Sequence, residues 1–218
     1  MKIHFADSEY WDDLGEDFQK AYKKALEEAY HKAASLLPFG SNRANFFIQP
    51  RDYSLIEETH DAGRTYNSSF IELAFDPVFA KKHRPAILGS LQHMVFHEMN
   101  HAARFNLNIW HTTALDMCLL EGLAVVFERD YSGASPLWGL YDKKVIKDWV
   151  EEIRALPDGI VNDEYLYLHS DGRKWIGYKV GTYIVDEAMK KSGKTVIELT
   201  QMECADILKI TNSTHRIY

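Results

Sequence analysis

The segment His97–His101, with the sequence HEMNH, combines two imidazoles and a carboxylate at a spacing that could bind a metal ion. Residues four apart on an α-helix lie on one face with Cβ atoms about 5–6 Å apart, so His97 and His101 can reach the same ion. Glu98 projects beside the open coordination position. A zinc-bound water there would have its pKa lowered to about 7, and Glu98 could take its proton. The pattern predicts hydrolytic chemistry.

Glu121 is the candidate for a third ligand. It follows His101 by 20 residues and interrupts the apolar stretch 117–127. A buried carboxylate without a partner would cost on the order of several kcal/mol, and a metal ion would remove that cost. One alternative is a surface helix that carries two histidines and an acid without binding a metal, and another is a helical domain that is free of zinc. The run Ile87–Phe96, which has apolar residues on more than one face, predicts a buried helix instead.

The arrangement of His97, Glu98, His101 and Glu121 resembles that of the gluzincin metallopeptidases, the thermolysin-like group. The EGLA run that begins at Glu121 looks most like a small uncharacterised family of predicted zinc-dependent proteases. The similarity extends over about residues 45–210 and includes the GYKVG segment at 177–181. It implies a Zn²⁺ cofactor, a zincin-like fold, and a peptide or small protein as substrate.

One position departs from the thermolysin-like pattern. Those enzymes usually carry an aspartate four residues after the glutamate ligand, where this chain has Val125. Ligating histidines almost always donate to a partner that orients the ring. Asp116, Glu128 and Asp186 are the candidates for that partner, and their spacing does not choose among them.

Hydrolysis of a peptide bond also needs a donor that stabilises the oxyanion. Tyr178 is the first candidate because it lies in the segment shared with the similar predicted proteases, and Tyr183 and His169 stand behind it. The alternative for Tyr178 is aromatic packing. His93, one turn before His97, is expected to be a core residue or a neighbour of the ligands, and His111 a loop residue.

The composition narrows the class of partner. With 218 residues and 46% hydrophobic content, the chain is expected to form a single domain, 1–218. A net charge of −7 without a basic run argues against nucleic acid and against an anionic membrane surface. There is no apolar run long enough for a membrane span or a signal peptide, and Cys118 and Cys204 suit reduced core thiols. These features predict a cytoplasmic protein.

The elements that must position the site are predicted to be mainly helical, in an α+β fold. The N-terminal lobe, 1–110, is expected to contain a cover helix at Asp12–Leu37 and a metal helix from Pro85 to about Asn106. Between them, 45–77 has β-like runs at 46–48 and Phe70–Phe75, which predict a small antiparallel sheet. The gluzincin resemblance implies an edge strand that holds substrate, and Phe70–Phe75 is expected to be that strand; the alternative is a sheet that only covers the core.

The helical C-terminal lobe, 111–218, is expected to carry the third ligand on a helix capped by Thr112 or Thr113 and ended by Ser132–Gly133. Three further helical regions are expected at 142–156, 171–191 and 195–210. Gly177 and Gly181, four apart in the second of these regions, predict a close approach of another backbone. The leading function is a zinc metallopeptidase, and the alternative is a catalytically weak or inactive zinc-binding regulatory protein that retains the fold.

Overall fold

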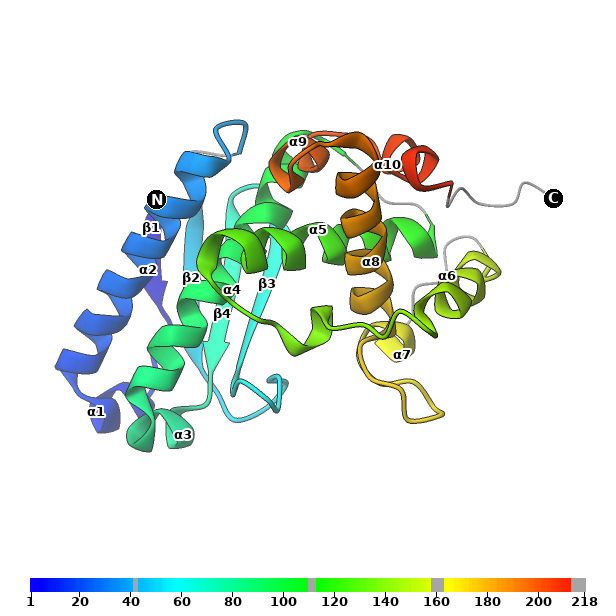
Figure 1. Cartoon of the computed structure of the whole chain (residues 1–218). Helices are drawn as coiled ribbons and strands as arrows, with labels where there is room; N and C mark the ends of the chain where they lie inside the picture. The colour runs from blue at the N-terminus through cyan, green and yellow to red at the C-terminus, as the bar shows by residue number, and fades with distance from the viewer. Residues whose placement is uncertain (41–42, 110–112, 158–162, 213–218) are drawn as a thin grey trace. The chain divides into compact units, whose positions relative to one another are not determined.

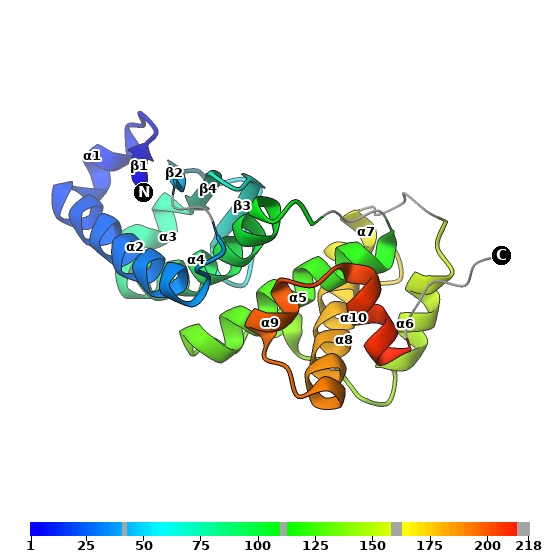
Figure 2. The same cartoon turned by 90° about the horizontal axis from the view of Figure 1, so that it is seen from above.

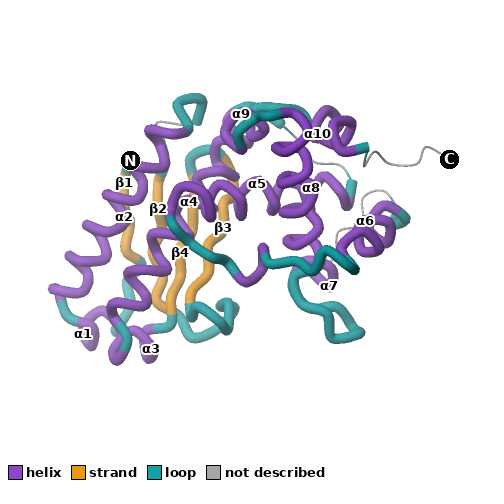
Figure 3. Tube along the Cα trace, viewed as in Figure 1, coloured by secondary structure: helices purple, strands orange, loops and turns teal. Residues whose placement is uncertain are grey.

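The computed structural model describes residues 1–40, 43–109, 113–157 and 163–212. The chain divides into two compact units, Met1–Leu107 and Asn108–Tyr218. Within the described residues every strand belongs to the first unit, and the second is helical (Figures 1 and 3). The expected α+β, mainly helical fold is confirmed. None of the described helices has the length and apolar character needed to cross a membrane.

The described residues of the first unit form four strands and four helices. In chain order they are β1 (Lys2–Phe5), α1 (Tyr10–Leu14), α2 (Glu16–Leu36), β2 (Asn45–Pro50), β3 (Asp61–Asn67), β4 (Phe70–Phe75), α3 (Pro77–Lys82) and α4 (Arg84–Asn106). The cover helix expected from Asp12 is therefore interrupted at its start. Gly15, with φ of 80°, separates α1 from α2, and glycine adopts this conformation without steric cost.

The sheet has the strand order β1-β2-β4-β3. Strand β2 pairs in parallel with β1 and β4, and only the β3–β4 pair is antiparallel, so the prediction of an antiparallel sheet was wrong. Phe70–Phe75 was also wrongly expected to be an edge strand, because β4 has a partner on each side. Four of its six residues are buried, which suits a central strand. The free edges belong to β1 and β3.

Helices α2 and α4 lie on one face of this sheet (Figure 2). From α2, the rings of Phe18 and Tyr22 pack against Phe75 of β4 with centroid distances of 5.7 and 5.1 Å. Helix α4 runs along β3, where the Ser90 hydroxyl donates a hydrogen bond to Asp61. The metal-motif helix therefore rests directly on an edge strand.

The second unit is built around α5 and α8. Its elements are α5 (Ala114–Ser132), a 3-10 turn η1 (Leu137–Gly139), α6 (Ile146–Arg154), α7 (Asp163–Leu166), α8 (Ile176–Ser192), α9 (Val196–Thr200) and α10 (Cys204–Thr211). Helix α8 begins five residues later than expected. The chain before it folds back through a bridge between Leu168 and Lys174, and Trp175 takes a left-handed conformation with φ of 63°.

Two glycines allow α5 and α8 to touch through their backbones. A Cβ on Gly181 would lie 1.7 Å from the carbonyl oxygen of Cys118, and a Cβ on Gly122 would lie 2.1 Å from the carbonyl carbon of Gly181. Neither distance is possible for a real side chain. The close backbone approach predicted for Gly181 is confirmed, and its partner is the helix that carries Glu121.

Candidate metal centre

Helix α4 presents His97 and His101 as a pair. It covers the predicted range almost to the residue and has a proline in its first turn, where the missing N–H costs nothing. The candidate ligand nitrogens of the two histidines lie within 4.8 Å of one another. The ring centroids are also 4.8 Å apart, with the planes inclined at 78°. Because the rings are not stacked face to face, they can turn neighbouring nitrogens toward one ion.

The part of α4 that carries the motif is buried on all sides. Every residue from Val95 to Arg104 is buried, with exposed fractions of 9% for His97, 5% for Glu98 and 7% for His101. The prediction of a buried helix is confirmed, and the alternative of a solvated surface helix is wrong. Polar side chains in such a position need partners, because desolvation without them is costly.

The Glu98 carboxylate lies against β3. The hydroxyl of Thr65 donates to Glu98 Oε2 over 2.7 Å and also lies 3.0 Å from the Glu98 carbonyl oxygen. At Gly63, a Cβ would come within 2.5 Å of Glu98 Oε1. Neither Thr65 nor Gly63 is among the site residues expected from the sequence. The only available signal was the short run Ala62–Tyr66, whose threonine and tyrosine suit a strand.

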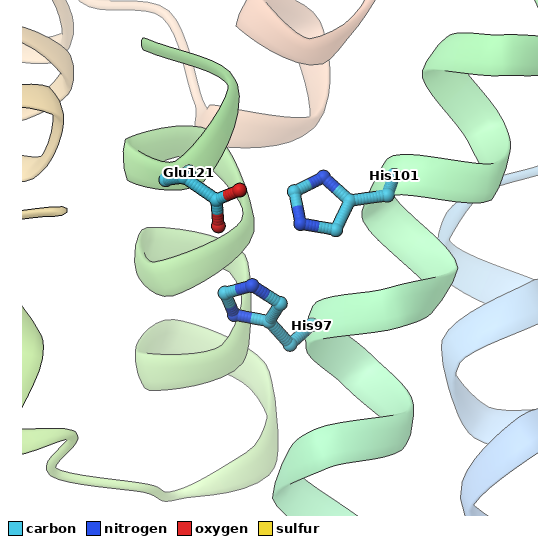
Figure 4. A group of neighbouring side chains, drawn as sticks. All are labelled: His97, His101 and Glu121. Atoms are coloured by element: carbon cyan, nitrogen blue, oxygen red, sulfur yellow. The ribbon is translucent and has the colours of Figure 1, made fainter. Parts of the chain in front are cut away.

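Glu121 lies half-buried on α5, in the second unit. The predicted cap of this helix is confirmed for Thr113, whose hydroxyl accepts from Asp116 N while Asp116 accepts from Thr113 N. Gly133 ends the helix in the left-handed conformation, also as predicted. Thr112 and His111 lie outside the described residues. Figure 4 draws Glu121 on α5 and His97 and His101 on α4.

Two of the candidates for an orienting carboxylate have structural partners of their own. Asp116 completes the α5 capping box, and Asp186 binds Arg129 at 3.0 Å and the Tyr141 hydroxyl at 2.9 Å. Burial, with the Asp186 charge adding to it, raises the pKa of Tyr141. Glu128 is the third candidate and is 2% exposed. That one of these three carboxylates orients a ligand histidine stays a prediction.

The candidates for an oxyanion donor have packing partners as well. Tyr178 contacts Trp175 edge to face at 5.5 Å, and Tyr183 contacts Tyr141 at 5.5 Å. His169 lies 2.9 Å from an Asp171 carboxylate oxygen. These contacts support aromatic packing for Tyr178, and its role as a donor stays a prediction. His93 is half-buried on α4, one turn before His97.

A family model described as "Predicted Zn-dependent protease (DUF2268)" matches residues 20–209. The match takes in α4 with both histidines and α5 with Glu121. No significant match was found among curated proteins or among solved structures. Since the model covers most of the chain, the protein belongs to this family of predicted zinc-dependent proteases.

Proposed function

We propose that the protein is a zinc metallopeptidase of the gluzincin type that hydrolyses a peptide bond in a peptide or small protein. The observation that carries the proposal is the buried pair His97 and His101, one turn apart on α4, with Glu98 between them in the sequence. The name of the family supports zinc dependence and proteolysis.

The donor set suits zinc. Two neutral imidazoles and one carboxylate form a common ligand set of catalytic zinc, which keeps a fourth position open. His97 and His101 would supply the imidazoles, and Glu121 would supply the carboxylate as the third member of a possible metal-binding group. A bound zinc ion would act as a Lewis acid and lower the pKa of water at the open position.

Glu98 is the proposed general base. Its carboxylate is not needed as a ligand, and Thr65 holds one of its oxygens, Oε2. Oε1 remains to accept a proton from the attacking water and to pass it to the leaving amine. Catalysis by a positioned base of this kind contributes typically about 10²–10⁴-fold to the rate.

Strand β3 is the proposed backbone-binding edge for the substrate, in place of Phe70–Phe75. Among the described strands it pairs with β4 alone, and apart from the bridge between Asp61 and Ile56 its other edge offers main-chain groups that an extended peptide could use for β-augmentation. The same strand contacts Glu98 through Gly63 and Thr65. Tyr178 is proposed as the donor to the oxyanion.

The test compares the wild-type protein with Glu98→Gln in two measurements, zinc content and cleavage of a peptide library. Both proteins should hold one zinc per chain, and Glu98→Gln should lose at least about 10²-fold in kcat. Retained turnover in Glu98→Gln would refute the role of the base. Zinc binding without cleavage by the wild type would favour the regulatory alternative, and absence of zinc would refute both functions.

A further inference from the structure

The contact between β3 and Glu98 is more specific than helix packing requires. Thr65 Oγ1 has one proton, and the structure offers it two acceptors on the same residue, the Glu98 carbonyl and carboxylate Oε2. The carboxylate is the nearer acceptor, at 2.7 Å against 3.0 Å, and hydrogen bonds to ionised groups are roughly twice as strong as neutral ones. The hydroxyl therefore fixes Oε2.

Gly63 provides the space in which the carboxylate lies. A Cβ at this position would meet three atoms of Glu98, with Oε1 at 2.5 Å, Cγ at 2.7 Å and Cδ at 2.8 Å. The strand thus leaves room for the carboxylate at one residue and binds it at the next residue on the same face. A larger side chain at 63 would fit only if Glu98 or the strand moved.

Regular pairing of β3 ends immediately after this contact. The register between β3 and β4 shifts between Thr65 and Asn67, which leaves Tyr66 as a bulge residue whose hydroxyl donates to Glu72. Bulges commonly redirect a side chain beside a functional site. Here Thr65 is the last regularly paired residue before the bulge, and its side chain faces α4.

We infer that Thr65 is a positioning residue for the general base Glu98, and that Gly63 leaves the space that the Glu98 carboxylate needs. This inference rests on the proposed function. A free glutamate side chain samples many rotamers, and a base is effective only within hydrogen-bond reach of the proton that it takes. The Thr65 hydroxyl holds Oε2 and leaves Oε1 for the proton. Because Thr65 belongs to a strand with a free edge, the base is fixed to the same strand that would hold the substrate.

The first experiment removes the hydroxyl without changing the shape of the side chain. In Thr65→Val, kcat should fall by about 10–100-fold, which is part of the roughly 10²–10⁴-fold that a positioned general base contributes, while KM and zinc content stay within about twofold. Thr65→Ser, which restores the hydroxyl, should recover most of the loss. Thr200→Val is the matched control, because the Thr200 hydroxyl is also buried and donates over 2.8 Å to Val196 O of its own helix, α9, which carries none of the proposed site residues.

The second experiment displaces the carboxylate and leaves the hydroxyl in place. Gly63→Ala should lower kcat by a similar factor, with zinc content again unchanged. Its matched control is Gly89→Ala on α4, where a Cβ would have no atom within 4 Å. If Thr65→Val and Gly63→Ala both keep the wild-type kcat, the inference is wrong.

A third measurement needs neither zinc nor activity. In the metal-free protein, Thr65→Val should lower the folding equilibrium constant by about tenfold, and by clearly less in a Glu98→Ala background. If Thr65→Val lowered the folding equilibrium constant equally in both backgrounds, the hydrogen bond between Thr65 and Glu98 would contribute nothing to stability and the inference would be wrong. A wild type that binds zinc but cleaves nothing would instead refute the proposed function, whereas an active wild type with fully active Thr65 and Gly63 variants would refute only the inference.

Discussion

Helices α4 and α5 carry the proposed metal ligands, and their neighbours hold them in different ways. Helix α4 meets β3 through side chains, with Ser90 bonded to Asp61 and Glu98 bonded to Thr65. Helix α5 meets α8 through main-chain atoms, at Gly122 and Gly181. The contact between α4 and β3 is made by polar side chains, which can change conformation. The contact between α5 and α8 is possible only because two residues have no side chain.

The two histidine ligands and the glutamate ligand are therefore positioned by different interactions. His97 and His101 come together through the periodicity of one helix, so their pairing needs little beyond the formation of α4. The position of Glu121 depends on how α5 packs inside the second unit. A side chain added at Gly63 meets the flexible end of Glu98, whereas one added at Gly181 meets the Cys118 carbonyl. We therefore expect substitutions at the contact between β3 and α4 to change mainly catalysis, and those at the contact between α5 and α8 to change mainly folding stability.

The two helices also begin differently. Thr113 and Asp116 form a complete capping box at the start of α5. At the start of α4 the N-cap residue His83 makes no side-chain capping bond, and the first turn contains a proline. Proline in the first turn lacks the N–H that would otherwise need a partner, so α4 depends less on a cap. Replacement of the N-cap residue should therefore lower the free energy of unfolding at α5 and leave it nearly unchanged at α4.

The largest effect is expected from Gly181→Ala. The added Cβ would lie 1.7 Å from a backbone oxygen, so α5 and α8 would have to separate. Overpacking of a core typically costs about 1–3 kcal/mol and occasionally more, and a backbone clash places this variant at about 3 kcal/mol or above. Denaturant unfolding measures the change. Gly89→Ala on α4 is the control and should stabilise by about 0.5–1 kcal/mol, as alanine does in a helix. A loss below about 1 kcal/mol for Gly181→Ala would contradict the comparison.

A smaller effect is expected from removal of the α5 cap. Thr113→Ala should cost about 1 kcal/mol of unfolding free energy because Asp116 N loses its acceptor. Thr113→Ser should restore most of this. The matched variant His83→Ala, at the N-cap of α4, should change the free energy of unfolding by less than about 0.5 kcal/mol. Equal losses at the two N-caps would remove the distinction between the helices.

The features that the sequence predicted well are those set by local chemistry. The range of α4 follows from its apolar pattern, and the limits of α5 from Thr113 and Gly133, because capping residues act on the first or last turn only. The pairing of His97 with His101 likewise needs only the helical repeat. Within the candidate site, these residues could be found without knowledge of the fold.

The features that it missed depend on contacts between distant segments. Phe70–Phe75 was recognised as a strand, but its central place in the sheet depends on pairing with β2 and β3, which no pattern within the strand encodes. The contact of Thr65 with Glu98 joins residues 33 positions apart. Helix α8 was expected to begin at Asp171 because nothing local marks the left-handed turn at Trp175. Each of these three features is set by tertiary packing and not by the local sequence.

The smallest effect is expected from a salt bridge in the loop that leads into α8, and it should depend on pH. Arg173 donates two hydrogen bonds to Glu152 of α6, at 2.7 and 2.8 Å, and binds Asp171. The hydrogen bonds from Arg173 are the main reason that the pKa of Glu152 lies below its ordinary value of 4.5. A folded-state pKa that is depressed adds stability that is present above the ordinary value and lost as the pH falls through the folded value.

Glu152→Gln measures this contribution. The Glu152 side chain is 33% exposed, so solvent screens the pair and the loss near neutral pH should be only about 0.5 kcal/mol. The difference between wild type and Glu152→Gln should shrink as the pH falls below 4.5 and vanish once the pH lies below the depressed folded-state pKa of Glu152, where the carboxylate is protonated in both states. Unfolding free energies at several pH values test this, with Glu16→Gln as the control in the first unit, since Glu16 pairs with Lys20 and both side chains are largely exposed. A difference that persists at low pH would show that Arg173 holds the loop through packing over Trp149, where its guanidinium lies 5.3 Å from the ring centroid, and not through charge.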